Sequence, residues 1–207
     1  MRFYLCYFVI LILQACSNKQ NTHLENEEYE IINLVLNHRH NLAPDSVERK
    51  YAKQRAEDKY FGRKNYTKEY NEDLKKIDSM QLCLFIDDTL QIVDTKNHFI
   101  KNQKDSVYYP LVVKLADSTQ KKKIDITKLK CKYNYRIDYK SNEENYEEGF
   151  IHVKTFYFSR VVFNKSRDRA CIYFITRGGS SLFFFKKENG KWMLEFDKIK
   201  YITMLEE

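Results

Sequence analysis

Glycine and proline are scarce in this chain, with five Gly and two Pro among 207 residues. That scarcity excludes a collagen-like repeat and a chain whose disorder comes from Pro and Gly. Hydrophobic residues make up 43% of the sequence and aromatic residues 15%, so the chain has enough apolar side chain to build a core. The length suits one large domain or a domain with a helical extension.

Long hydrophobic runs are also missing. The longest apolar run, residues 3–13, has about half of the roughly 20 residues that a helix needs to cross a bilayer. Arg2 and the free amine place positive charge before the run, which is the layout of a signal peptide and not of a membrane span. The run ends at a leucine, glutamine, alanine and cysteine, and the chain turns polar immediately after Cys16.

The four residues Leu13-Gln14-Ala15-Cys16 resemble the lipobox of bacterial lipoproteins, in which a small residue precedes an invariant cysteine. The resemblance implies that residues 1–15 are removed, that the Cys16 thiol is diacylated, and that Cys16 becomes the lipid-anchored N-terminus. Two or three acyl chains give lasting attachment where one does not, because each buried methylene contributes about 0.8 kcal/mol. Gln14 departs from the small residue usual at its position. An ordinary secretory signal, or a buried N-terminal strand, is the alternative.

The predicted anchor sets the compartment and the domain limits. We expect residues 16–24 to form a polar tether and residues 25–207 to form a single domain. Ser17 is not an acidic retention residue, and no acidic run follows Cys16. We therefore expect the protein in the cell envelope, lipid-anchored to the outer membrane and facing the periplasm.

The chain carries a formal net charge of +7. In a cytoplasmic protein that balance would suggest nucleic acid as the partner, because Lys and Arg neutralise phosphates. An exported, lipid-anchored protein does not routinely meet nucleic acid, so we expect no nucleic-acid partner. An envelope polyanion or another envelope protein is the expected partner, beside the membrane itself. The alternative is that the lysines only solvate the surface.

Helical patterns occupy the first third of the domain. Residues 25–38 carry an apolar stripe with acids in the first turns, where the helix dipole favours negative charge. Residues 45–61 follow Pro44, which suits a helix start, and their dense charge predicts a solvated helix. Residues 66–78 are similarly polar, and their pattern leaves open whether they are helical or irregular.

Strand patterns begin near Met80. Residues 80–93 suggest a hairpin with turn residues at 87–89, and the apolar run 106–115 suggests a strand near an edge because it contains Pro110. Residues 129–140 alternate apolar and polar side chains, which predicts a half-buried strand with Cys131 pointing inward. The last third reads as a meander. The fold class is therefore α+β, with N-terminal helices packed on an antiparallel β-sheet of about six strands.

The final hairpin has the most specific signal. Asn189-Gly190 predicts a type I′ turn, because both central residues of that turn need positive φ. The register then places Trp192, Leu194 and Phe196 together on the core face. The segments "FSRVVFNKSRDRACIYF" and "FFFKKENGKWML", with the Gly-Gly turn between them, resemble the C-terminal segment of a group of lipoproteins from Bacteroidota. No activity is established for that group, so the resemblance implies none.

Few residue patterns suggest chemistry. No serine lies in a G-x-S-x-G elbow, and His152, in a predicted strand, has no evident orienting partner. His38 and His40 lie on different faces of a helix without a carboxylate to complete a zinc site. Adjacent aspartates before Thr89 are ordinary turn chemistry. We therefore predict no catalytic residue, no metal site and no cofactor.

The turn Arg177-Gly178-Gly179-Ser180 is the best candidate for a binding site. Paired glycines can direct backbone N–H groups outward, and Arg177 adds positive charge, so the turn has the composition of an anion-binding nest. A plain two-glycine hairpin turn is the alternative. Cys6 belongs to the predicted signal and Cys16 to the predicted anchor, which leaves Cys83, Cys131 and Cys171. Three cysteines cannot all pair within one chain.

The sequence favours a non-enzymatic envelope protein that binds a partner through its basic or aromatic surface. An envelope enzyme with a pocket between the helices and the sheet is the main alternative. A membrane-anchored immunity protein fits the size and the anchor, without support from any residue.

Replacement of the anchoring thiol tests the predicted compartment. We expect Cys16→Ser to move the protein from the membrane fraction to the soluble fraction and to abolish labelling with a fatty-acid analogue, because no acyl chain can attach. Fractionation with metabolic labelling measures both effects. A Cys16→Ser protein that kept its label and stayed in the membrane would show that the lipobox interpretation is wrong.

Overall fold

The computed structural model describes residues 24–38, 41–61, 67–91, 93, 107–116, 122–145 and 149–201. Residues 1–15 and Cys16, with the predicted signal and anchor, lie outside these ranges. Over the described residues the fold is α+β, as predicted. No helix among them is both long and apolar enough to span a membrane.

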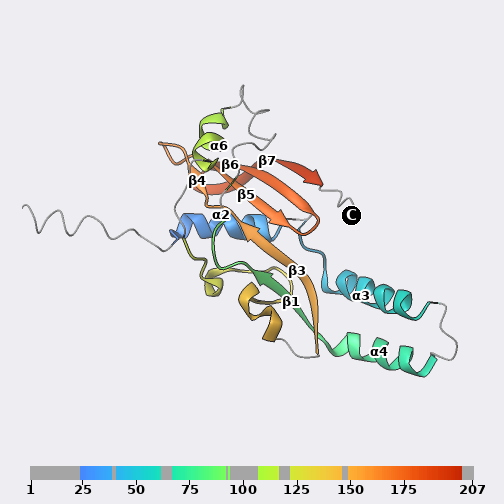
Figure 1. The fold of residues 1–207 in the computed structure, drawn as a ribbon. Helices are drawn as coiled ribbons and strands as arrows, with labels where there is room; N and C mark the ends of the chain where they lie inside the picture. The colour runs from blue at the N-terminus through green and yellow to red at the C-terminus, as the bar shows by residue number, and fades with distance from the viewer. Residues whose placement is uncertain are drawn as a thin grey trace, which may run out of the picture.

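Helices precede and flank a single mixed sheet (Figure 1). The helices are α2 (Asn26–Leu36), α3 (Asp45–Tyr60), α4 (Thr67–Ser79) and α6 (Tyr109–Ala116), with short 3-10 helices η1 (Ile126–Lys128) and η2 (Lys140–Asn145). The strands are β1 (Gln81–Ile86), β2 (Arg136–Tyr139), β3 (Phe150–Phe158), β4 (Val162–Phe163), β5 (Arg169–Thr176), β6 (Gly179–Glu188) and β7 (Lys191–Tyr201). The helices predicted over 25–38 and 45–61 are confirmed, and the polar segment 66–78 proves helical.

The strand order is β2-β1-β3-β5-β6-β7, and β4 pairs with β5. β1 is parallel to both β2 and β3, whereas β3, β5, β6 and β7 pair antiparallel. The prediction of a wholly antiparallel sheet is therefore wrong for the first three strands. Parallel neighbours need long crossovers. The chain between β1 and β2 contains α6, and η2 carries it past β1 to β3.

Two apolar cores lie on opposite faces of the antiparallel strands. α2 belongs to the core on one face and α6 to the core on the other. Along β5, Ala170, Ile172 and Phe174 point to the α2 side. Cys171 and Tyr173 point to the α6 side. Strands covered on both faces read as continuous apolar runs, which explains the uninterrupted burial in the middle of β5 and β6.

The hairpin predicted over 80–93 is absent. β1 ends at Ile86, and residues 87–89 form a local turn in which the Asp87 side chain accepts a hydrogen bond from the Thr89 backbone (3.0 Å). Beyond this turn Gln91 forms a bridge to Ser159, so the chain continues along another part of the sheet. The first apolar run pairs with β2 and β3, and the second contacts a distant segment through an isolated bridge, which a local pattern cannot show.

The strand predicted over 106–115 is helix α6. Pro110 is the second helical residue, where the missing N–H has no helical partner to lose. The buried side chains follow helical spacing and form the second core: Tyr108, Leu111, Val112 and Leu115. A ten-residue apolar run fits either period, and a proline is compatible with a strand edge as well as with the helix start that it marks here.

Only the end of the predicted strand 129–140 is a strand, β2. Before β2, the backbone forms hydrogen bonds with side-chain amides in and directly after α2, as it would with a neighbouring strand. Asn33 accepts from the Lys130 backbone N–H (2.7 Å), and Asn37 accepts from the Lys132 backbone N–H (2.7 Å). Both amides also donate to backbone carbonyls of the same segment. The alternation of buried and exposed side chains survives, and Cys131 packs against the α2-side core as predicted.

The β6–β7 hairpin has the predicted turn, with φ of 50° at Asn189 and 77° at Gly190. Trp192 is 6% exposed and contacts Phe163, with ring centroids 5.5 Å apart. A bulge after Leu194 shifts the register, so that Phe196 lies on the α6 side and stacks on Phe184 (4.5 Å). The core position of Trp192 is confirmed, whereas the prediction is wrong for Leu194, which is 37% exposed, and for Phe196, which lies on the other face.

Truncation of Trp192 tests its role in the core. We expect Trp192→Ala to lower the free energy of unfolding by about 3–5 kcal/mol, because it leaves a cavity in the core. Denaturant titration followed by circular dichroism measures the change. The native emission of this sole tryptophan should be blue-shifted and should redden on unfolding. Met193→Ala, at a 54% exposed neighbour, is the control. Emission typical of exposed tryptophan in the folded protein would contradict the core position.

Carboxylates at the start of α2 bind the loop between β4 and β5 and the end of β6. Arg167 donates to Glu27 (2.6 Å) and to Glu25 (2.7 Å), and Lys187 also donates to Glu27. Hydrogen bonds from Lys187, then from Arg167, lower the pKa of Glu27 below its ordinary value of 4.5. A carboxyl whose pKa is lower in the folded state stabilises the fold above its unfolded pKa. That contribution is lost as the pH falls through the folded pKa.

Glu27→Gln tests this contribution. We expect a lower melting temperature than wild type at neutral pH and a smaller further loss on acidification below pH 4.5, because the variant lacks the titrating carboxyl. Thermal unfolding across a pH series measures both. Glu30→Gln, at an exposed carboxylate of the same helix, is the control. Parallel pH curves for Glu27→Gln and wild type would contradict the assignment.

Candidate functional site

A fork in the sheet contains a large cavity. β3 pairs with β1 along its length but with β5 only through Tyr157 and Phe158. Before these two residues β3 runs away from the β5–β6 hairpin, and the α3–α4 hairpin lies beside the gap (Figure 1). A cavity of about 1010 Å³ occupies this fork. Its walls come from α3, α4, η2, β3 and the β5–β6 turn.

Positive side chains dominate the described wall of this cavity, which we call the fork cavity. Four cations line it: Arg55, Lys140, Lys154 and Arg177. The carboxylate lining it, within the described residues, is Glu143. Like charges gathered in one concave surface raise the local potential for anions.

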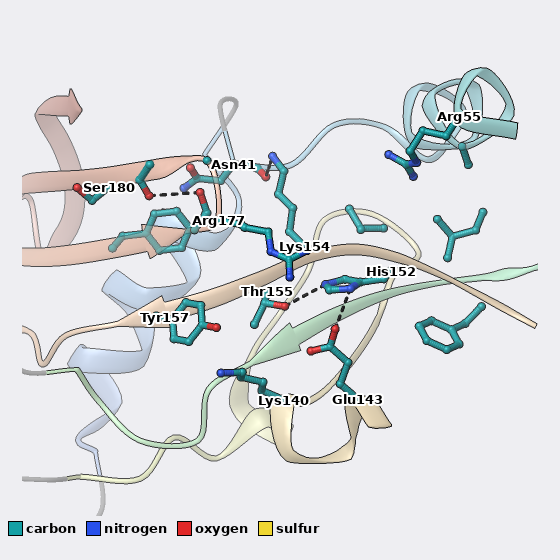
Figure 2. A pocket seen from close by; sticks show the side chains of 18 of the residues that line it. Asn41, Arg55, Lys140, Glu143, His152, Lys154, Thr155, Tyr157, Arg177 and Ser180 are labelled. Atoms are coloured by element: carbon teal, nitrogen blue, oxygen red, sulfur yellow. Dashed lines mark hydrogen bonds and ion pairs between the residues drawn. The ribbon is translucent and has the colours of Figure 1, made fainter. Parts of the chain in front are cut away.

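Two of these cations form no direct contact with a carboxylate of the described residues. Within the described part of the chain, neither Arg55 nor Arg177 forms a hydrogen bond or ion pair, and both side chains are exposed to the cavity. Arg177 extends into the cavity from the β5–β6 turn, and Arg55 lies on the α3 side (Figure 2). Guanidinium groups offer paired N–H donors that match carboxylate and phosphate oxygens.

The two lysines are held in place by groups without charge. Lys154 Nζ donates to the Asn41 carbonyl (2.9 Å). Lys140 Nζ lies 4.9 Å from the centre of the Tyr157 ring, and its hydrogen bond with Tyr157 raises the pKa of Lys140. Glu48 lies near Lys154 and Arg55, but burial raises the pKa of Glu48 more than their charges lower it. The lining of the fork cavity carries a net positive charge, because its four cations outnumber the carboxylate of Glu143 among the described residues.

Glu143, His152 and Thr155 form a hydrogen-bonded chain on the cavity wall (Figure 2). His152 Nδ1 lies 2.9 Å from Glu143 Oε1, and His152 Nε2 lies 2.9 Å from Thr155 Oγ1. The His152 ring also packs edge-on against Phe85, with centroids 5.2 Å apart. The sequence-based view that His152 lacks an orienting partner is wrong, because Glu143 fills that role.

A β-bulge brings His152 and Thr155 to one face. Residues three apart on a regular strand point to opposite faces of the sheet. Cys83 pairs with His152 but Leu84 pairs with Lys154, so Val153 is an extra residue in β3. Such bulges redirect side chains and are frequent beside functional sites. Sequence reasoning missed this pair because a bulge at Val153 leaves no mark in the residue pattern.

The predicted anion-binding turn lies on the same wall. Thr176 pairs with Gly179, so Arg177 and Gly178 form the two-residue turn between β5 and β6. Arg177, Gly178, Gly179 and Ser180 all line the fork cavity, and Ser180 is 3% exposed. The structure thus brings this turn together with Arg55, Lys140 and Lys154. Anion binding by the turn stays a prediction.

Other sequence candidates lie away from the fork cavity. His38 packs edge-on against Phe183 at 5.3 Å, while Arg39 and His40 fall outside the described residues. Cys83, Cys131 and Cys171 are free thiols. Within the described ranges, no group of three or more His, Cys, Asp or Glu side chains could hold a metal ion.

Comparisons with known proteins give no relative. No protein-family model, curated protein or solved structure matches the chain. The resemblances to bacterial lipoproteins at Cys16 and in the C-terminal segment therefore stay predictions. The geometry and charge of the fork cavity are the basis for assigning a function.

Proposed function

We propose that this protein is a lipid-anchored component of the cell envelope that binds an anionic ligand in the fork cavity. One observation carries the proposal: Arg55 and Arg177 face one cavity from different walls, without partners among the described residues. Lys140 and Lys154 add charge beside them, and Glu143 is engaged by His152. A bound anion would compensate these charges through charge-assisted hydrogen bonds.

A neighbouring cavity extends the basic surface. It has a volume of about 930 Å³ and shares Arg55, Ile77, Met80 and Phe150 with the fork cavity. Lys59 and Lys76 add positive charge there, and Asp73 is bound by Tyr60 (2.7 Å) and by Lys59 (3.3 Å). Each cavity alone is near the upper end of the range for small-molecule sites, about 300–1,000 Å³. Their continuity favours an elongated ligand with several negative charges.

The predicted anchor narrows the chemistry of the ligand. An anchored domain reaches only what lies near the membrane, where acidic glycans, phosphorylated glycolipids and anionic headgroups carry the negative charge. These ligands share phosphate or carboxylate groups spaced along a polar scaffold. The separated guanidinium groups of Arg55 and Arg177 can bind phosphate or carboxylate groups that are spaced along one ligand.

Removal of the two arginines tests the proposal. We expect Arg177→Ala to weaken binding of inorganic polyphosphate about tenfold and Arg55→Ala, Arg177→Ala together to weaken it further. The reason is that each hydrogen bond to a charged group contributes about 1.5–3 kcal/mol. Isothermal titration calorimetry on the protein from Cys16 onward, carrying Cys16→Ser, measures the affinity.

Lys50→Ala is the matched control, because Lys50 is an exposed cation of α3 that does not line the fork cavity. It should bind polyphosphate as wild type does. Equal binding by the double arginine variant and wild type would refute the proposal. A loss in Lys50→Ala as large as that in Arg177→Ala would also refute it, by showing attraction to net charge alone.

A further inference from the structure

The hydrogen-bonded chain in the fork cavity fixes the tautomer of His152. A carboxylate only accepts hydrogen bonds, so His152 Nδ1, 2.9 Å from Glu143 Oε1, carries a proton. In the neutral imidazole Nε2 then has a free lone pair, and the Thr155 hydroxyl donates to it over 2.9 Å. The hydroxyl is thereby placed beside a base, and the base is oriented by an acid. This arrangement of nucleophile, base and orienting carboxylate is the one that acyl-transfer sites use.

The surroundings of these three hydrogen-bonded side chains suit a chemical reaction and not only a structural contact. Glu143, His152 and Thr155 all line the fork cavity, so a bound molecule can reach the hydroxyl. The side chains of Glu143 and His152 are about one third exposed, at 33% and 32%. The bulge at Val153 is the local irregularity that brings the imidazole and the hydroxyl together.

We propose that the fork cavity is also an acyl-transfer site for an anionic ester. Thr155 is the nucleophile, His152 is its general base, and Glu143 is a positioning residue that holds the imidazole. Arg177, which extends into the cavity from the β5–β6 turn, stabilises the negative oxygen that forms on the ester carbonyl. The anionic character of the substrate rests on the proposed function, whereas the Thr155 chemistry does not.

The reaction balances with water as the second substrate. Thr155 Oγ1 adds to the ester carbonyl carbon while its proton moves to His152 Nε2. The bond from that carbon to the alcohol oxygen then breaks, His152 returns the proton to this oxygen, and the alcohol leaves. Water attacks the acyl-Thr155 ester, with His152 again taking a proton. The Oγ1–carbon bond then breaks, the proton returns to Oγ1, and a carboxylic acid leaves.

Hydrolysis of activated esters tests the site in the protein from Cys16 onward, carrying Cys16→Ser. The probes are the neutral 4-nitrophenyl acetate and the anionic 4-nitrophenyl succinate. We expect kcat/KM to be higher for the anionic ester and mass spectrometry to find the acyl group on Thr155. Thr155→Ala should lose about 10²-fold or more in kcat for both esters, and Thr155→Ser should retain activity. Glu143→Gln should lower kcat more than it changes KM and should alter the pH profile.

Thr127→Ala is the matched control, since the Thr127 hydroxyl is also hydrogen-bonded to a side chain, the Asp125 carboxylate (2.6 Å), but does not line the fork cavity. It should hydrolyse both esters as wild type does. Equal rates for Thr155→Ala and wild type, or an acyl group found only elsewhere, would refute the acyl-transfer site. That result leaves polyphosphate binding as a separate measurement. Conversely, Thr155-dependent hydrolysis without preference for the anionic ester, or with a preference that Arg55→Ala leaves unchanged, would refute only the charge of the substrate.

Discussion

The double pairing of β3 is the constraint on which the rest of the structure depends. One edge of β3 pairs in parallel with β1 from Phe150 to Phe156, and the other edge meets β5 only at Tyr157 and Phe158. A strand that continued along β5 from its start would close the sheet and leave no fork. Because β3 joins β5 so late, the sheet opens toward α3 and α4. Segments far apart in the chain then converge on one cavity.

Aromatic packing holds this junction closed at its narrow end. The Phe174 ring lies 5.0 Å from that of Phe156 and 5.2 Å from that of Phe158, and all three side chains are buried. Burying a phenylalanine side chain contributes about 1.5–3 kcal/mol, so this cluster is a strong local contribution at the point where the two parts of the sheet meet. The walls of the cavity thus diverge from this packed aromatic cluster, which helps to fix the positions of Arg177 and His152.

The sequence predicted the elements whose signals are local. The acids and apolar stripe of 25–38, the proline before 45, and the Asn189-Gly190 turn each act within a few residues, and each prediction is confirmed. Parallel pairing of β1, the helix at 109–116 and the two bulges were missed. Pairing partners lie tens of residues away, a short apolar run fits two periods, and a bulge shifts a register without changing composition.

The candidate site shows the same division. Arg177 and its glycines were found from the sequence because a Gly-Gly turn after an arginine has a recognisable composition. Glu143 has no distinguishing pattern in the sequence, because its contact with His152 depends on η2 lying beside β3. No pattern in the sequence distinguishes Lys154 and Arg55 from the other charged residues. Only the fork gives them a common cavity.

The charged side chains around the fork cavity are arranged differently from those at the start of α2. Glu25 and Glu27 are bound by Arg167 and Lys187, so the acids at the start of α2 are compensated. In the fork cavity, by contrast, Arg55 and Arg177 form no hydrogen bond or ion pair with a carboxylate among the described residues, and β3 carries an extra residue. Gathered like charges and an interrupted strand both cost stability. Natural proteins retain such local costs mainly at functional sites, and here both fall on one cavity. Their coincidence does not depend on any single contact, and it is the physical reason for proposing that this protein functions through the fork cavity and not through the covered faces of its sheet.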